Sequence, residues 1–218
     1  MTGFRIAAGL AAALMLGAAA PQPDDTARPN AVDIGFSQDM AVHHDQAVLM
    51  ARLVRDRASP PIRQLASQIE ANQAQEIGML RGWLVLWNQP ALAAAPMRWM
   101  SSNPGGQGPM MKDSHGMMMM MNGQAMADGG AMPGMASQAE LDALQKAQGV
   151  DIDKLFLRMM IKHHLGGIIM LRAVEKGAAL PVVRSMARNM EFDQAQEIVY
   201  MDKLGQSLGM TTKQISER

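Results

Sequence analysis

Apolar residues recur every three or four positions along four segments of the chain, which is the spacing of the buried face of an α-helix. These segments cover residues 36–57, 60–88, 151–176 and 181–208. In the second segment the stripe steps through Ile62, Ile69 and Leu80. No segment shows the alternation of a half-buried strand, so the pattern predicts an all-α protein.

Local signals mark the ends of these helices. Asp33 or Ser37 is placed to cap the first helix, and the dipeptide Ser59-Pro60 has the form of an N-cap followed by proline at the first helical position. Gly177 is a typical C-terminal stop for the third helix. The segment Ser137-Gln-Ala-Glu140 has the form of a capping box and predicts a further helix start.

The first and third helical segments are copies of one another. Phe36, Met40, His43, His44 and Met50 correspond to Phe156, Met160, His163, His164 and Met170, with a shift of 120 positions. Further along, Gln73-Ala-Gln-Glu76 corresponds to Gln194-Ala-Gln-Glu197 with a shift of 121. The Gln and Glu of both copies interrupt the apolar stripe at the same steps, so they occupy inward positions.

Two copies of a helix pair joined by a long, Met- and Gly-rich crossover predict a ferritin-like four-helix bundle made of two antiparallel hairpins. Neither hairpin covers its own apolar stripe, so we expect the halves to pack face to face as one domain. The predicted organisation is a signal peptide at 1–20, a flexible leader at 21–32, a first hairpin at 33–88, a disordered Met-rich linker at 89–136 and a second hairpin at 137–210.

The N-terminal residues have the form of an export signal. Arg5 precedes an apolar run at 6–17, and small residues follow at 18–20. This run is shorter than the roughly 20 residues that a membrane span needs. We expect cleavage near Ala19 or Ala20 and a periplasmic or secreted protein with no membrane attachment. An uncleaved anchor is the alternative.

The composition limits the chemistry. The chain has 20 basic and 20 acidic residues, so no excess positive charge favours nucleic acid or an anionic membrane surface. It has no cysteine, which excludes disulfides and thiolate ligands. Its 24 methionines supply soft sulfur instead, and twelve of them lie between Met97 and Met135. With His115, these linker methionines either bind metal or are low-complexity sequence without that role.

Helical periodicity places the repeated histidines and methionines on one face of each helix, within an arc of about 120°. Folding each hairpin about its turn sets Glu76 level with His43 and Glu197 level with His163. Packing the halves together would then gather these groups in one central layer, with Met50 either in a neighbouring site or in the core. The candidate metal ligands are Met40, His43, His44, Met50, Glu76, Met160, His163, His164, Met170 and Glu197.

Purely structural roles compete with metal binding. Methionine is a common core residue, and an inward His–Glu pair can be a hydrogen-bonded pair that fixes helix register. The recurrence of ionisable residues at one level of both hairpins favours a metal site, because burial of such groups is costly without partners.

The donor types narrow the choice of metal. Di-iron bundles use Glu-x-x-His, but Met79 follows Glu76 by three positions and Tyr200 follows Glu197 by three, so that signature is absent. Imidazole with thioether suits Cu(I), whereas imidazole with carboxylate suits Cu(II) or Zn(II). We therefore expect copper, with zinc as the alternative.

The repeated Met-x-x-His-His motif with its later Met, together with the repeated Gln-Ala-Gln-Glu segment, resembles the bacterial family known as domain of unknown function 305. The resemblance covers about residues 33–88 and 150–208. It implies a ferritin-like helical bundle. Some exported members of that family are copper-binding proteins implicated in copper resistance, with His and Met ligands, which implies a similar role here.

The second copy departs from the first at two positions. Met159 stands where the first copy has Asp39, and Gly167 stands where it has Ala47. The Met-rich insert lies outside the core pattern of the family, so the resemblance implies nothing about its role.

Three classes of function follow from these observations. The first is an exported protein that binds or sequesters copper in copper homeostasis or resistance. The second is a structural or stress-related interaction bundle with a buried His/Glu layer. The third, a ferritin-like redox metalloenzyme, is disfavoured by the missing Glu-x-x-His, and no catalytic triad, phosphate loop or nucleophilic cysteine favours an enzyme. The expected partners are a metal ion and either a metal-exchange protein or a second copy of the chain.

Overall fold

The structure is a computed structural model that describes residues 28–101, 111–112, 118–119 and 132–211. The expected signal peptide, most of the leader and much of the Met-rich linker lie outside these residues. Within the described part of the chain, no helix is long and apolar enough to cross a membrane.

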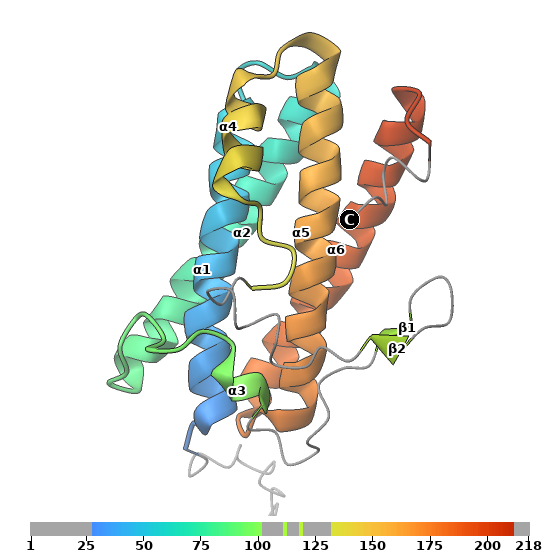
Figure 1. Cartoon of the computed structure of the whole chain (residues 1–218). Coiled ribbons are helices and arrows are strands. Elements are labelled where there is room, and N and C mark those ends of the chain that lie inside the picture. The colour runs from blue at the N-terminus through green and yellow to red at the C-terminus, as the bar shows by residue number, and fades with distance from the viewer. Residues whose placement is uncertain (1–27, 102–110, 113–117, 120–131, 212–218) are drawn as a thin grey trace, which may run out of the picture.

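Four long helices form the body of the protein (Figure 1). They are α1 (Ala31–Val54), α2 (Pro60–Leu86), α5 (Gly149–Gly177) and α6 (Pro181–Ser207). α1 packs along α2 and α5 along α6, and the two hairpins meet mainly through α1 and α5. The prediction of an all-α fold is confirmed, whereas its ferritin-like detail stays a prediction.

Shorter elements lie around this bundle. They are α3 (Arg98–Ser101), α4 (Gln138–Lys146) and the antiparallel strands β1 (Met111–Lys112) and β2 (Met118–Met119). The sequence did not predict the strands, because two residues are too few to show an alternating pattern. At the start of α4, Glu140 N–H donates to the Ser137 hydroxyl and Ser137 N–H donates to the Glu140 carboxylate, so the expected capping box is confirmed.

α1 begins earlier than the sequence predicted. The side-chain oxygen of Asn30 accepts hydrogen bonds from the N–H groups of Val32 and Asp33, and the Asp33 carboxylate accepts one from Asn30 N–H. The expected caps, Asp33 and Ser37, therefore lie inside the helix. That prediction is wrong because Asn30 completes a capping box upstream, so the end of the expected flexible leader is helical.

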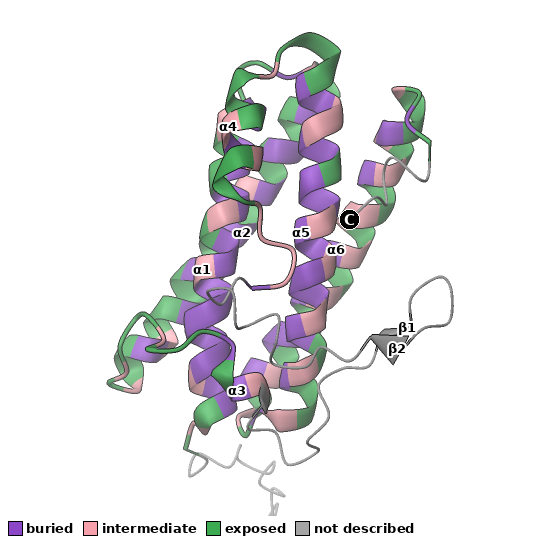
Figure 2. Ribbon diagram, viewed as in Figure 1, coloured by how far each residue is buried: buried purple, intermediate pink, exposed green. Residues whose placement is uncertain are grey.

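The interior contains two apolar clusters, one on each side of the middle of the bundle. Phe156 belongs to the cluster near the turn of the first hairpin, and Phe36 belongs to the cluster near the turn of the second. Each cluster combines residues of both hairpins because α1 and α5 run antiparallel. Buried residues are concentrated along α1 and α5, whereas α2 and α6 expose more of their surface (Figure 2).

One end of the expected linker packs against α1. Met97 and Trp99 are buried, and both donate hydrogen bonds to the Asp39 carboxylate, through the backbone N–H at 2.6 Å and the indole N–H at 2.8 Å. Gly35 allows the indole to approach, because a Cβ there would lie 2.5 Å from Trp99 Cδ1. The prediction of disorder across 89–136 is wrong for this end, since a buried carboxylate anchors it.

The other end of the expected linker is also packed. Residues 132–136, called here the strap, cross the region where α1 meets α5. Gln46 holds the strap by accepting a hydrogen bond from Ala136 N–H at 2.7 Å and donating one to Ala136 O at 2.9 Å. On α5, Gly166 makes room for the strap, because a Cβ there would overlap the Pro133 carbonyl.

Candidate metal centre

A polar layer separates the two apolar clusters. Its six side chains, each at most 4% exposed, are His43, His44, Gln73, His163, His164 and Gln194. All six belong to the repeated segments, and each of the four long helices contributes at least one. The fold therefore places the repeated histidines in one layer at the centre of the bundle.

His43 and His163 lie at the middle of this layer, where α1 meets α5. Their ring centroids are 3.8 Å apart, and the ring planes are inclined by 32°. His163 Nε2–H donates to the backbone oxygen of His43 at 3.0 Å, and His43 Nε2–H donates to Pro133 O in the strap at 3.0 Å. Because a carbonyl oxygen can only accept, these two bonds assign the proton to Nε2 of each ring.

His44 and His164 each approach a glutamate of their own hairpin. His164 Nε2–H donates to Glu197 Oε2 at 2.6 Å. His44 Nε2 lies 2.8 Å from Glu76 Oε2, but the approach is off the N–H direction, so this contact is short without being an aligned hydrogen bond. Both glutamates are partly exposed and reach from the surface to the layer.

The expected pairs, His43 with Glu76 and His163 with Glu197, are wrong by one residue. Successive side chains on a helix point about 100° apart. His44 consequently faces α2, while His43 faces α5. The prediction placed the glutamates at the correct level along the helix axes. It did not predict in which direction around its own axis each histidine points.

Within the described residues, Nδ1 is buried and has no hydrogen-bond partner in His43, His44 and His164. In His44 the buried Nε2 has no aligned hydrogen-bond partner either, although it lies close to Glu76. In His43 and His164 the proton resides on Nε2, which donates to an oxygen, so Nδ1 carries a free lone pair. The layer thus contains buried nitrogen donors whose ring orientation is already fixed.

The environment keeps the central histidines neutral. Burial, followed by the charge of His44, lowers the pKa of His43 to about 3, although the hydrogen bond to Pro133 acts in the opposite direction. Burial also holds the pKa of His163 well below its ordinary value, and a charge on His43 would lower it further. Both imidazoles are therefore uncharged at neutral pH.

The two inward glutamines complete the layer. Gln73 Oε1 and Gln194 Oε1 are buried and have no hydrogen-bond partner in the part of the chain that the structure describes. The space that Gly167 leaves beside the histidines is taken by Gln194, because a Cβ on Gly167 would lie 2.6 Å from Gln194 Oε1. These amide oxygens are further acceptors within the buried polar layer.

The four candidate methionines lie in the flanking apolar clusters. Met50 and Met160 belong to one cluster, Met40 and Met170 belong to the other, and all four are fully buried. The structure therefore divides the expected methionines between the two sides of the layer. In the described residues, no three or more His, Asp and Glu side chains are arranged to hold a metal ion by themselves.

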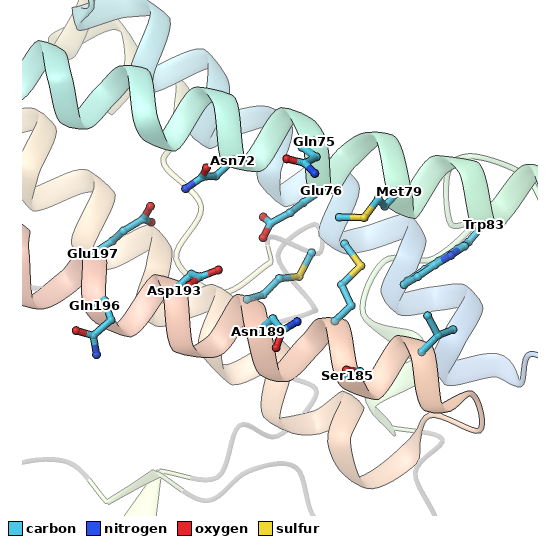
Figure 3. Close-up of a pocket in the computed structure, with 13 residues that line it drawn as sticks. Asn72, Gln75, Glu76, Met79, Trp83, Ser185, Asn189, Asp193, Gln196 and Glu197 are labelled. Carbon is cyan, nitrogen blue, oxygen red and sulfur yellow. The ribbon is translucent and has the colours of Figure 1, made fainter. Parts of the chain in front are cut away.

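A cleft of about 580 Å³ runs between α2 and α6. Glu76 projects from α2 toward α6 in Figure 3, and Asp193 and Glu197 line the facing side. Burial, followed by the charges of Glu76 and Glu197, raises the pKa of Asp193. The cleft is acidic, and two of its carboxylates are those that contact His44 and His164.

Sequence reasoning missed several residues of this region. The Pro133 carbonyl and the strap gave no signal, because a backbone acceptor is independent of residue type. Asp193 and Met186 gave a usable signal, since both fall on the inward side of α6 at helical spacing from Met190 and Glu197.

The family model described as "Domain of unknown function (DUF305)" matches residues 33–205. The chain belongs to the DUF305 family. The resemblance drawn from the repeated motifs is thereby confirmed.

Solved DUF305 structures are similar to this chain. One, from Streptomyces coelicolor and named as a secreted protein, is 33% identical, covers 83% of this chain and 94% of its own, and has a TM-score of 0.68. A DUF305 fragment from Deinococcus radiodurans is 26% identical, covers 84% and 98%, and has a TM-score of 0.62.

CopM in its Cu(I)-bound form is also similar to this DUF305 protein. It is 23% identical, covers 80% of this chain and 96% of its own, and has a TM-score of 0.57. At that identity the similarity establishes a shared fold. No curated protein matches the chain significantly.

Proposed function

We propose that this DUF305 protein binds copper and that the histidine layer is its principal site. The observation that most directly supports this proposal is the arrangement of the ring nitrogens. His43 and His164 donate Nε2–H to an oxygen and keep Nδ1 buried with no partner among the described residues. His44 likewise directs Nε2 toward Glu76, although without an aligned hydrogen bond. An imidazole that binds a metal usually donates its other N–H to a carboxylate or carbonyl in this way.

The charge state of the layer supports the proposal. A metal competes with protons for imidazole nitrogen, so a histidine must be neutral to bind. The lowered pKa values of His43 and His163 keep both rings in the neutral form at any pH near 7. These two rings are available without a proton having to leave.

Sulfur donors lie one helical turn from the layer. Met40 precedes His44 by four positions and Met160 precedes His164 by four, so each pair shares a helix face. Imidazole with thioether favours Cu(I). We propose these pairs as ligands, with Met50 and Met170 as further thioethers from the flanking clusters.

The carboxylates would allow the site to bind metal ions other than Cu(I). Glu76 and Glu197 contact His44 and His164, and imidazole with carboxylate suits Cu(II) and, as the alternative, zinc. The crystal structures of CopM include Cu(I)-, Cu(II)- and Ag-bound forms, and their shared fold supports a metal site in this bundle.

We propose an exported protein that sequesters copper in the periplasm or outside the cell. The sequence pattern of the N-terminal residues supports export, as does the similarity to a DUF305 protein named as secreted. Besides the metal ion, the proposed partner is a metal-exchange protein or a second copy of the chain.

A purely structural polar layer is the second candidate. It is favoured by the close, tilted packing of the His43 ring on the His163 ring and by the hydrogen bond from His164 to Glu197, which pair part of the layer without a metal. On this interpretation the histidines fix the register of the helices, and any copper would bind to other methionines.

Replacement of His44 and His164 by Ala tests the proposal. His115→Ala is the matched control, because it removes the fifth histidine from outside the repeats. We expect the double variant to lose the tightest Cu(I) site in a titration against a competing chelator, and the control to keep it. Thermal melts of the metal-free proteins complete the test. Unchanged copper affinity with a lower melting temperature in the double variant would instead establish the structural role.

A further inference from the structure

The cleft between α2 and α6 is lined by three thioethers that the histidine layer does not use. Met79 comes from α2, and Met186 and Met190 come from α6. Met79 is 42% exposed, whereas Met186 and Met190 are 8% and 1% exposed. The cleft therefore has an accessible methionine at its rim and two nearly buried ones deeper inside.

Helical spacing brings these groups to face each other. On α2, Glu76, Met79 and Trp83 are separated by three and then four positions and share one face. On α6, Met186 and Met190 are separated by four positions and share another. Both faces line the same cleft, and the labelled residues of α2 in Figure 3 lie along the side opposite those of α6.

The electrostatics of the cleft favour a cation. Glu76, Asp193 and Glu197 line it, and none of the described residues that line it is basic. Trp83 is at the same end as Met79, and an indole face attracts cations. The carboxylates alone would suit a hard divalent ion, whereas the thioethers are additional donors that prefer to bind a soft ion.

We propose that Met79, Met186 and Met190 form a second site, open to solvent, for a soft monovalent cation such as Cu(I) or Ag(I). This site is separate from the buried histidine layer and binds whether or not the layer is intact. Glu76 and Glu197 line the cleft on one side and contact His44 and His164 on the other, so an ion in the cleft is next to the route into the layer.

Nuclear magnetic resonance of the methionine methyl groups tests this site in the full chain. Protein labelled with ¹³C at these methyls is titrated with Ag(I), and the three cleft signals are assigned by their absence in M79L, M186L and M190L. We expect these three signals to shift together and to saturate at the same Ag(I) concentration, even while linker methionines respond separately.

Two variants serve as controls. The triple replacement M79L, M186L and M190L should bind one Ag(I) fewer per chain than the unsubstituted protein. The matched triple replacement of Met159, Met201 and Met210 by Leu changes buried methionines of the other apolar cluster, which do not line the cleft, and should bind the full number. Leu replaces Met at similar volume, so both variants keep an apolar core.

The same titration in the His44→Ala and His164→Ala double variant separates this site from the histidine layer. Persistent, coincident shifts of the cleft methyls would support an independent site, whatever becomes of the layer. The proposal is overturned if the cleft methyls stay unshifted while other methionines respond. It is also overturned if they shift only when both histidines are present, which would leave copper binding by the layer intact.

Discussion

Asp33 and Asp153 occupy equivalent places in the two halves, and each caps the turn of the opposite hairpin. Asp33, in α1, accepts a hydrogen bond from Leu180 N–H at 3.1 Å, and Asp153, in α5, accepts one from Ser59 N–H at 3.0 Å. Both carboxylates are buried. These two hydrogen bonds connect the N-terminal part of α1 to the turn of the second hairpin and that of α5 to the turn of the first. They fix the antiparallel register in which His43 packs against His163.

Removal of either carboxylate should destabilise the bundle. We expect Asp33→Ala and Asp153→Ala each to lower the free energy of unfolding by about 1–3 kcal/mol, because a part-buried N–H at the opposite turn loses its acceptor. Asp56 is largely exposed, so Asp56→Ala is a suitable control and should change stability by less than about 0.5 kcal/mol. Urea unfolding followed by circular dichroism measures these differences. Equal stability of all three variants would show that the exchanged caps do not hold the halves together.

The stability of the metal-free protein should decrease in mild acid because of His43. Its pKa is about 3 in the folded chain and about 6.5 in the unfolded chain, so between these values the unfolded chain binds more protons. The free energy of unfolding should therefore fall as the pH drops below about 6.5, by up to about 1.4 kcal/mol per pH unit for this group.

Urea unfolding at several pH values, for the unsubstituted protein and for His43→Gln, isolates this contribution. In His43→Gln the free energy of unfolding should change less steeply with pH, by up to about 1.4 kcal/mol per pH unit, which corresponds to one proton. His163, whose pKa burial also lowers, still contributes in His43→Gln, but the charge of His43 no longer lowers its pKa further there. Parallel curves for the two proteins would mean that His43 is accessible to protons in the folded state.

Glu197 should influence copper affinity through the ring it orients. Its carboxylate accepts a hydrogen bond from His164, and loss of such a partner typically lowers metal affinity by about 10–100-fold. We expect that loss for Glu197→Ala in a Cu(I) titration. Glu191→Ala, on the same helix, removes a carboxylate that pairs with the exposed Arg172 and should have no effect. Equal affinities in the two variants would argue for a structural layer.

Gly166→Ala should displace the strap from the bundle. A Cβ at this position meets the Pro133 carbonyl, which is backbone and cannot rotate away, so the hydrogen bond from His43 to Pro133 should break. Hydrogen exchange measured by mass spectrometry should show faster exchange in residues 132–136.

Gly78→Ala is the matched control for this change. Among the described residues, no atom beyond the chain neighbours and the backbone of α2 itself lies within 4 Å of a Cβ at Gly78. We expect this variant to gain about 0.5–1 kcal/mol of stability, because Ala favours a helix more than Gly. Strap exchange that is unchanged in Gly166→Ala would contradict the close approach of Pro133 to α5.

The sequence by itself determined the helices and the residues that face inward. Helical periodicity is a local property, so the recurrence of His43, His44 and Glu76 in a second copy was enough to predict an all-α duplicated bundle with a central polar level. The same reasoning found the capping box at Ser137, because its two partners are three residues apart.

The tertiary structure alone decided how those side chains meet. The rotation of each helix about its axis assigns His44 to Glu76 and leaves His43 against His163, and periodicity fixes that rotation only relative to the helix itself. The hydrogen bond from Trp99 to Asp39 and the hydrogen bond from His43 to the strap join residues far apart in the chain. Such contacts depend on packing between elements, and no local pattern of residue types encodes them.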